Sequence, residues 1–174
     1  LEADFQINAF SGLGMTRHYN GNTGFLPFQD YYKRTLVSDE STLYDYSKWT
    51  PDIVIIALGT NDFSTALKSD EVYQSREDLH LAYREKYKAF ISMIREQHSN
   101  VKILAIANNL YPDEEMKTQV KLIVDEQKAE GHQDIYYKVL RNTTGYGCGW
   151  HPDKATHRKW AEELNKEIAK IMSW

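Results

Sequence analysis

The chain has 174 residues, of which 41% are hydrophobic and 26% are charged, as expected for one globular domain with a sizeable core. A net charge of −4 excludes a basic surface for nucleic acid, and no apolar run approaches the roughly 20 residues of a membrane helix. The single cysteine excludes an internal disulfide and a cysteine-ligated metal site. The cysteine count does not decide the cellular compartment, and we favour a secreted or extracellular location.

The first part of the chain predicts one strand and one helix. Apolar and polar residues alternate over residues 5–10 (FQINAF), and the glycine-punctuated stretch 11–14 (SGLG) follows directly. This pattern is typical of a strand that ends in a turn. Residues 20–49 are the least regular stretch, and within them we expect a helix at about residues 29–36.

The middle of the chain predicts two buried strands with a helix between them. Residues 52–58 (DIVIIAL) and 101–107 (VKILAIA) are nearly all apolar, the pattern of strands covered on both faces. Pro51 is tolerated at the start of the first strand. Over residues 78–96, apolar side chains recur at spacings of three and four, which predicts a helix with one apolar stripe. The stripe consists of Leu79, Tyr83, Tyr87, Phe90, Ile91 and Ile94.

The last part of the chain completes an alternation of strands and helices. A helix opens at Pro112, carries three acidic residues in its first turn and ends near Gly131, which is a plausible C-terminal cap. Residues 134–139 (DIYYKV) predict a third strand, and a final helix begins around Asp153. Such alternation is the pattern of βαβ units, so we expect the whole chain (1–174) to form one α/β domain with a parallel sheet. The core face of the final helix is expected to consist of Trp160, Ala161, Leu164, Ile168 and Ile171.

Three loops leave the carboxyl ends of the predicted strands, where open α/β sheets bind their ligands. They are residues 11–14 (SGLG), 59–62 (GTND) and 146–152 (YGCGWHP). A glycine N–H, an asparagine amide and a histidine that meet at one edge are parts of an acyl-transfer site. Together they supply donors for a tetrahedral oxyanion and a base for the attacking hydroxyl.

Simpler interpretations stay open at this point. The loop around Asn61 matches an ordinary turn in which the asparagine caps a helix. His151 also fits a helix N-terminus without catalytic duty. Cys148 is three residues from His151 on one turn, which is poor geometry for a nucleophile and base pair. The other histidines are assigned structural or surface roles: His18, His80, His98, His132 and His157.

The order of the three loops resembles the SGNH, or GDSL-like, hydrolase superfamily over nearly the whole chain. More narrowly, residues 11–19 (SGLGMTRHY) and the run YDYSKWTPD (44–52) that leads into VIIALGTNDFS (54–64) look like carbohydrate esterase family two. Members of that family remove acetyl groups from plant cell-wall polysaccharides. The resemblance implies a flavodoxin-like three-layer α/β/α sandwich with a mostly parallel sheet.

The resemblance also implies roles for four residues. Gly12 and Asn61 become the oxyanion donors, and His151 becomes the general base. Many superfamily members have an aspartate three residues before this histidine, where this chain has Cys148. In family-two esterases without that aspartate, the main-chain carbonyl of the preceding tryptophan orients the ring. Trp150 matches that tryptophan, and its indole would also bind a sugar ring.

The nucleophile of the superfamily is absent from this sequence. No Gly-Asp-Ser occurs in it, and that block lies on the first, central strand of the superfamily fold. We therefore expect the first strand and the serine to come from a companion segment or chain. The alternative is that the fold is completed in an unexpected way. Ser11 precedes the oxyanion glycine and Ser64 follows the Asn-Asp turn, so neither is a suitable nucleophile.

These observations support three hypotheses. The leading one is an esterase that removes O-acetyl groups from xylan-, mannan- or glucan-type polysaccharides or oligosaccharides by a Ser-His mechanism, without metal or cofactor. The second is an SGNH lipase or thioesterase that acts on longer acyl chains. The third is a non-catalytic carbohydrate-binding remnant that keeps the scaffold.

Overall fold

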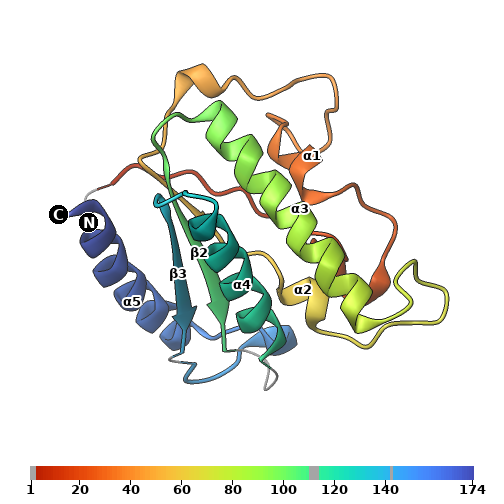
Figure 1. Ribbon diagram of the computed structural model, residues 1–174. Helices are drawn as coiled ribbons and strands as arrows, with labels where there is room; N and C mark the ends of the chain where they lie inside the picture. The colour runs from red at the N-terminus through yellow and green to blue at the C-terminus, as the bar shows by residue number, and fades with distance from the viewer. Residues whose placement is uncertain (1–2, 110–113, 142) are drawn as a thin grey trace.

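Three parallel strands in the order β1-β2-β3 form the centre of the protein (Figure 1). The structure, a computed structural model, describes residues 3–109, 114–141 and 143–174. The strands are β1 (Ile53–Ile56), β2 (Lys102–Asn108) and β3 (Ile135–Leu140). The helices are η1 (Tyr19–Gly21), α1 (Phe28–Tyr32), η2 (Tyr46–Lys48), α2 (Thr60–Phe63), α3 (Arg76–Gln97), α4 (Glu115–Ala129), η3 (Cys148–Trp150) and α5 (Lys154–Met172).

Helices cover both faces of the sheet (Figure 1). Successive side chains of a strand point to opposite faces, and β2 shows this directly. Its Ile103 and Ala105 join the core formed with α3 and α4, whereas Leu104 and Ile106 pack with apolar residues of α5. The predicted α/β class and three-layer arrangement are therefore confirmed.

The apolar stripe of α3 is the largest contributor to the core. All six predicted residues of the stripe are buried. Two of its tyrosines also hold the end of β1 and the residues after it, because Tyr87 donates to the Ile56 carbonyl at 3.4 Å and Tyr83 to the Leu58 carbonyl at 2.6 Å. The helix begins at Ser75, whose hydroxyl accepts from the Asp78 N–H, an ordinary N-terminal cap.

Other predicted elements are confirmed with small shifts in their bounds. The strands at 101–107 and 134–139 are β2 and β3. Gly131 follows α4 with a φ of 100°, and the His132 N–H bonds to the Gln127 carbonyl, as in a Schellman cap. Asp153 caps α5. The predicted opening of α4 at Pro112 lies outside the described residues.

Residues 5–10 do not form a strand, contrary to the alternating pattern. They are irregular and exposed, because a strand needs a neighbour to accept and donate its backbone hydrogen bonds and no described strand lies beside them. Of the strand predicted at 52–58, only β1 is regular. The prediction that this strand is buried on both faces is also wrong, since Ile55 is 39% exposed.

Two helix predictions need correction as well. The helix expected at 29–36 is the shorter α1, and the backbone after it turns into an isolated antiparallel bridge between Arg34 and Leu43. On α5, Trp160, Leu164, Ile168 and Ile171 join the core as predicted, but Ala161 is exposed. Within the described residues, no helix is long and apolar enough to cross a membrane.

Candidate active site at the carboxyl edge of the sheet

The loop before η1 and the start of α2 meet at the carboxyl end of β1. The Asn61 side-chain amide donates to the Leu13 carbonyl at 2.7 Å. Leu13 directly follows Gly12, which has a φ of 80°, a conformation that glycine adopts at no steric cost. The structure thus brings together the loops of the two predicted oxyanion donors.

Both groups keep donor capacity for a ligand. A side-chain amide has two N–H donors, and the contact with the Leu13 carbonyl uses one of those of Asn61. No described residue accepts a hydrogen bond from the Gly12 N–H. This corner of the sheet is therefore chemically able to bind an oxyanion.

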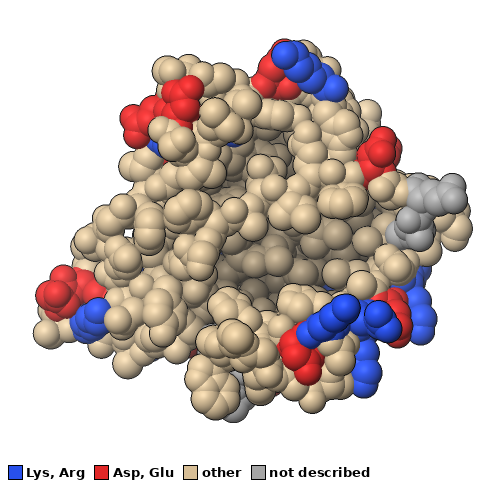
Figure 2. All heavy atoms as spheres, turned by 180° about the vertical axis from the view of Figure 1, so that it is seen from behind, with Lys and Arg blue, Asp and Glu red and all other residues tan. Residues whose placement is uncertain are grey.

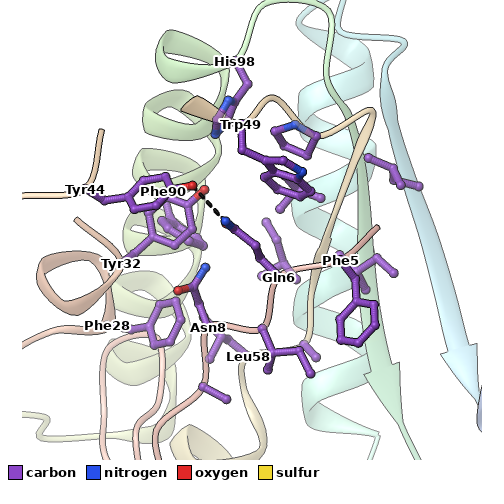
Figure 3. Close-up of a pocket in the computed structure, with 18 of the residues that line it drawn as sticks. Phe5, Gln6, Asn8, Phe28, Tyr32, Tyr44, Trp49, Leu58, Phe90 and His98 are labelled. Carbon is purple, nitrogen blue, oxygen red and sulfur yellow. Dashed lines mark hydrogen bonds between the residues drawn. The ribbon is translucent and has the colours of Figure 1, made fainter. Parts of the chain in front are cut away.

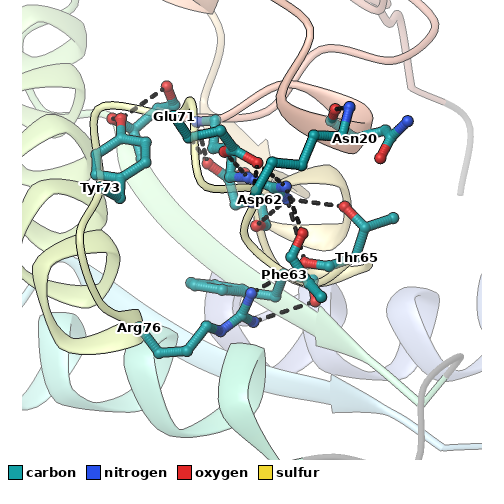
Figure 4. A network of polar contacts seen from close by, with 11 residues as sticks. Asn20, Asp62, Phe63, Thr65, Glu71, Tyr73 and Arg76 are labelled. Carbon is teal, nitrogen blue, oxygen red and sulfur yellow. Dashed lines mark hydrogen bonds and ion pairs between the residues drawn. The ribbon is translucent and has the colours of Figure 1, made fainter.

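Asp62 holds the glycine loop in place (Figure 4). Its carboxylate is fully buried and accepts the backbone N–H groups of Met15 at 2.9 Å, Thr16 at 2.7 Å and Arg17 at 2.8 Å. Gly14 permits this approach, because a Cβ there would lie 2.5 Å from a carboxylate oxygen of Asp62. The loop that carries Gly12 is thus tied to the helix that carries Asn61.

A buried ion pair between Arg17 and Glu71 also holds this loop. The Arg17 guanidinium bonds to both carboxylate oxygens of Glu71, at 2.5 and 2.7 Å. It also donates to the Thr65 hydroxyl at 2.9 Å and to the Asp62 carbonyl at 3.3 Å. The hydrogen bond from Arg17 lowers the pKa of Glu71. Sequence reasoning missed both Asp62 and Arg17, although Asp62 stands in the Gly-x-Asn-Asp motif itself.

We expect Asp62 to make folding stability depend on pH. Burial outweighs the three N–H bonds and raises the pKa of Asp62 from 3.8 to about 6. The folded state therefore binds this proton more tightly than the unfolded state, so the contribution is complete below pH 4 and is lost as pH rises through 6. The free energy of unfolding, relative to Asp62→Asn, should fall by about 3 kcal/mol at most from pH 4 to pH 7.

Urea denaturation at several pH values would measure this difference. Asp52→Asn is a suitable control, because Asp52 is exposed and its replacement should leave the pH profile unchanged. A difference between wild type and Asp62→Asn that stays constant across this range would contradict the prediction.

The segment that carries His151 forms a small hairpin near the carboxyl ends of the strands (Figure 1). Tyr146 and Pro152 form an antiparallel bridge. Between them, the Gly147 N–H donates to the His151 carbonyl at 2.7 Å, and the His151 N–H donates to the Cys148 carbonyl at 3.2 Å. These bonds place His151 immediately after the tip of the hairpin.

The tip itself has a left-handed backbone. Gly149 has a φ of 61° and Trp150 a φ of 63°, and the second value is uncommon for a bulky side chain. The indole of Trp150 is 80% exposed and meets the Tyr146 ring edge-on at 5.9 Å. The turn therefore presents a broad aromatic surface to solvent beside the histidine.

The structure does not join His151 to the oxyanion corner by direct contact. Its ring is exposed, and within the described residues it has no hydrogen bond to Asn61, Gly12 or the Trp150 carbonyl. Asp153 does not orient it either, because that carboxylate accepts the Thr156 N–H at 2.7 Å. The roles predicted for His151 and Trp150 therefore stay predictions.

Polar side chains link the strand ends along this edge. Asn108 at the end of β2 donates to the Thr60 hydroxyl at 2.8 Å, and Asn109 donates to the Arg141 carbonyl after β3 at 3.5 Å.

Among the described residues, no group of three or more His, Cys, Asp and Glu side chains could hold a metal ion.

A groove of about 600 Å³ lies between β1 and residues 3–10 (Figure 3), and Asn61 is one of the residues that line it. Gln6 spans it, donating to the Tyr44 hydroxyl at 2.9 Å. Figure 2 shows one face of the molecule hollowed near its centre, with charged side chains gathered around the margin. Apolar and aromatic side chains dominate the groove walls, among them Phe28, Tyr32, Trp49, Ile55, Leu58 and Phe90.

Comparison with known proteins identifies the chain. The model of the GDSL-like lipase/acylhydrolase family matches residues 6–164. An acetylxylan esterase/glucomannan deacetylase from Cellvibrio japonicus is 34% identical over 152 residues, which are 87% of this chain and 42% of that protein. The cellulase/esterase CelE of Acetivibrio thermocellus is 31% identical over 180 residues, covering 100% of this chain and 21% of that protein.

Solved structures agree with these relatives. One is a carbohydrate esterase whose active site displays divergent catalytic and non-catalytic binding functions, with a TM-score of 0.87 and 32% identity over 96% of this chain and 53% of that one. Another is a family two carbohydrate esterase from Clostridium thermocellum in complex with cellohexaose, with a TM-score of 0.81 and 29% identity over 94% and 48% of the two chains. The chain thus spans about half or less of these relatives. It belongs to the GDSL-like lipase/acylhydrolase family and, as its sequence predicted, is similar to carbohydrate esterases of family two.

Proposed function

We propose that the protein containing this chain removes O-acetyl groups from a polysaccharide or oligosaccharide by serine-dependent ester hydrolysis. The observation that carries the proposal is the contact between the Asn61 amide and the loop of Gly12 at the carboxyl end of β1. Fixed donors at such a corner stabilise the oxyanion of ester hydrolysis. The relatives named as acetylxylan esterases and glucomannan deacetylases support an acetyl ester of a sugar as the substrate.

In this proposal His151 takes the proton of the serine hydroxyl as the serine oxygen attacks the acetyl carbon. The carbonyl oxygen then holds the negative charge between Gly12 and Asn61. When this intermediate collapses, the bond from the acetyl carbon to the sugar oxygen breaks, and His151 gives its proton to that oxygen. Water releases acetate from the acyl-enzyme in the second half of the reaction. Trp150 is suited to bind the sugar, because its exposed indole stands directly before the histidine.

The serine is proposed to come from a companion segment that fills the groove as a strand parallel to β1. β1 is at the edge of the described sheet, so one side of its backbone is open for pairing. A strand that ran parallel to β1 would end near Asn61, which lines the groove, where a nucleophile is needed.

Three side chains around the groove also favour an occupant. Phe5 and Ile7 are 78% and 77% exposed, and large apolar side chains exposed together mark an interaction site. His98 lines the groove, is only 3% exposed, and its Nδ1 has no hydrogen-bond partner among the described residues. A buried polar atom without a partner is costly, and a strand in the groove would offer one.

Hydrolysis of 4-nitrophenyl acetate tests the proposal. The protein with its companion segment should be active, and this chain alone should be at least about 10³-fold slower, because removing a nucleophile removes most of the rate enhancement. Replacing the serine of the companion segment with alanine should reproduce the loss. An isolated chain as active as the complete protein would contradict the proposed source of the serine.

The acyl and sugar preferences separate the remaining hypotheses. We expect acetyl esters to be hydrolysed faster than octanoyl esters, and acetate to be released from acetylated xylan or glucomannan. Faster hydrolysis of octanoyl esters would favour a lipase or thioesterase. Calorimetric binding of oligosaccharides without turnover of any acetyl ester by the complete protein would favour a non-catalytic binding module.

A further inference from the structure

Thr156 anchors the base of the hairpin that carries His151. The side chain is fully buried in the first turn of α5. Its hydroxyl accepts the Thr144 N–H at 2.9 Å and the Gly145 N–H at 3.2 Å, and it lies 3.1 Å from the Gly145 carbonyl. One hydroxyl thus holds the segment that leads into the hairpin.

The hydrogen-bonding capacity of this hydroxyl is fully used. A threonine hydroxyl has one hydrogen to donate and two lone pairs to accept with. The two N–H groups occupy both lone pairs, and the hydrogen can go to the Gly145 carbonyl or to the Thr144 hydroxyl, each 3.1 Å away. A side chain of the same shape without the hydroxyl would leave two backbone N–H groups without their partner.

The other arm of the hairpin is fixed to the same turn of α5. The Asp153 carboxylate accepts the Thr156 N–H at 2.7 Å, and the Asp153 N–H donates to the Gly145 carbonyl at 3.1 Å. A Cβ at Gly145 would lie 2.5 Å from the Asp153 carboxylate, so the two arms are in close contact. His151 is only two residues before Asp153.

The position of the His151 ring depends on this backbone, because no described side chain hydrogen-bonds to it. The preceding residue, Trp150, has a positive φ. A bulky residue keeps such a conformation only where the surrounding structure holds it. The bonds of Gly147 and His151 close the tip around it, and the bonds of Thr156 and Asp153 fix the base from which the tip extends.

The geometry points to Thr156 as a positioning residue for the catalytic base. It acts through the hairpin backbone and touches neither substrate nor the reacting atoms. The inference rests on the proposed function, in which His151 accepts the proton of the serine. A displacement of about 1 Å of a catalytic group lowers the rate on the order of 10²-fold, which sets the size of the expected effect.

Thr156→Val in the complete protein tests this role with 4-nitrophenyl acetate as substrate. We expect kcat to fall by about 10²-fold, with KM changed less than about twofold, because in the proposed function the acetyl group is held by the loops of Gly12 and Asn61 and not by the hairpin. Thr156→Ser keeps the hydroxyl and should restore kcat to within a few-fold of wild type. Ser75→Ala is the matched control, since it removes the cap of α3 far along the chain and should leave kcat unchanged.

Amide hydrogen exchange supplies a readout that needs no turnover. Exchange over residues 144–153 should accelerate in Thr156→Val and stay slow in Thr156→Ser and Ser75→Ala. If Thr156→Val does not fold, Asp153→Ala removes a more accessible part of the same anchor and should show the same pattern to a smaller degree. Unchanged kcat and unchanged exchange in a folded variant would overturn the inference, whereas full activity of a His151→Ala variant would overturn the proposed function instead.

Discussion

Replacing His151 with alanine is expected to lower kcat for 4-nitrophenyl acetate by about 10⁴-fold in the complete protein, the upper range for a general base. The free energy of unfolding should stay within about 0.5 kcal/mol of wild type, because surface substitutions without buried contacts have small effects. The His151 side chain is exposed and has no hydrogen bond to a described residue. Loss of activity without loss of stability would therefore report on the chemistry.

The chain offers a matched control for this experiment. His132 is an exposed histidine in the turn after α4, and it contributes to that turn through its backbone N–H. His132→Ala should keep both kcat and stability, since the backbone contact does not need the side chain. Loss of a general base lowers kcat by about 10²-fold or more. If His151→Ala lowered kcat by less than about tenfold, His151 would not be the general base.

Much of the fold could be predicted because it is encoded by local apolar periodicity. The stripe from Leu79 to Ile94 fits one face of a helix, and burying that face requires a sheet against it. The run that became β2 is apolar enough to be covered by helices on both faces, and five of its seven residues are buried. These patterns depend on side chains only a few residues apart, so they survive in a single sequence.

The prediction for residues 5–10 was wrong because a strand is not a local structure. Its alternating pattern is present, but strand hydrogen bonds need a neighbouring backbone, and the described sheet offers none at that position. The 39% exposure of Ile55 has the same origin. Apolar runs report what a segment is suited to bury, and they do not report whether the partner is present.

The motifs of the candidate site could be predicted from the sequence, but the buried side chains that anchor its loops could not. Gly12 and Asn61 follow from loop positions and donor chemistry, and the structure brings their loops together. The anchoring roles of Asp62 and Thr156 depend on three and two backbone N–H groups that converge in space. A buried carboxylate or hydroxyl with such partners has no signature in residue spacing.

Replacing Asn61 with alanine is expected to lower kcat by about 10²–10³-fold with little change in KM, the effect of removing one oxyanion donor. The amide performs two tasks with its two hydrogens. One holds the Leu13 carbonyl at 2.7 Å, which keeps the Gly12 loop in place, and the other is available to the oxyanion. Steady-state kinetics with 4-nitrophenyl acetate would measure the loss.

Asn61→Asp separates charge and donor chemistry from side-chain size. Aspartate fills nearly the same volume, but an ionised carboxylate only accepts hydrogen bonds and would repel both the Leu13 carbonyl and the developing oxyanion. Its kcat should therefore fall at least as far as that of Asn61→Ala. Asn22→Ala is the control, because Asn22 is exposed and its side-chain oxygen accepts the nearby Gly24 N–H, far along the chain from Asn61. If Asn61→Asp retained kcat while Asn61→Ala lost it, the asparagine would act by filling space, and the oxyanion would need another donor.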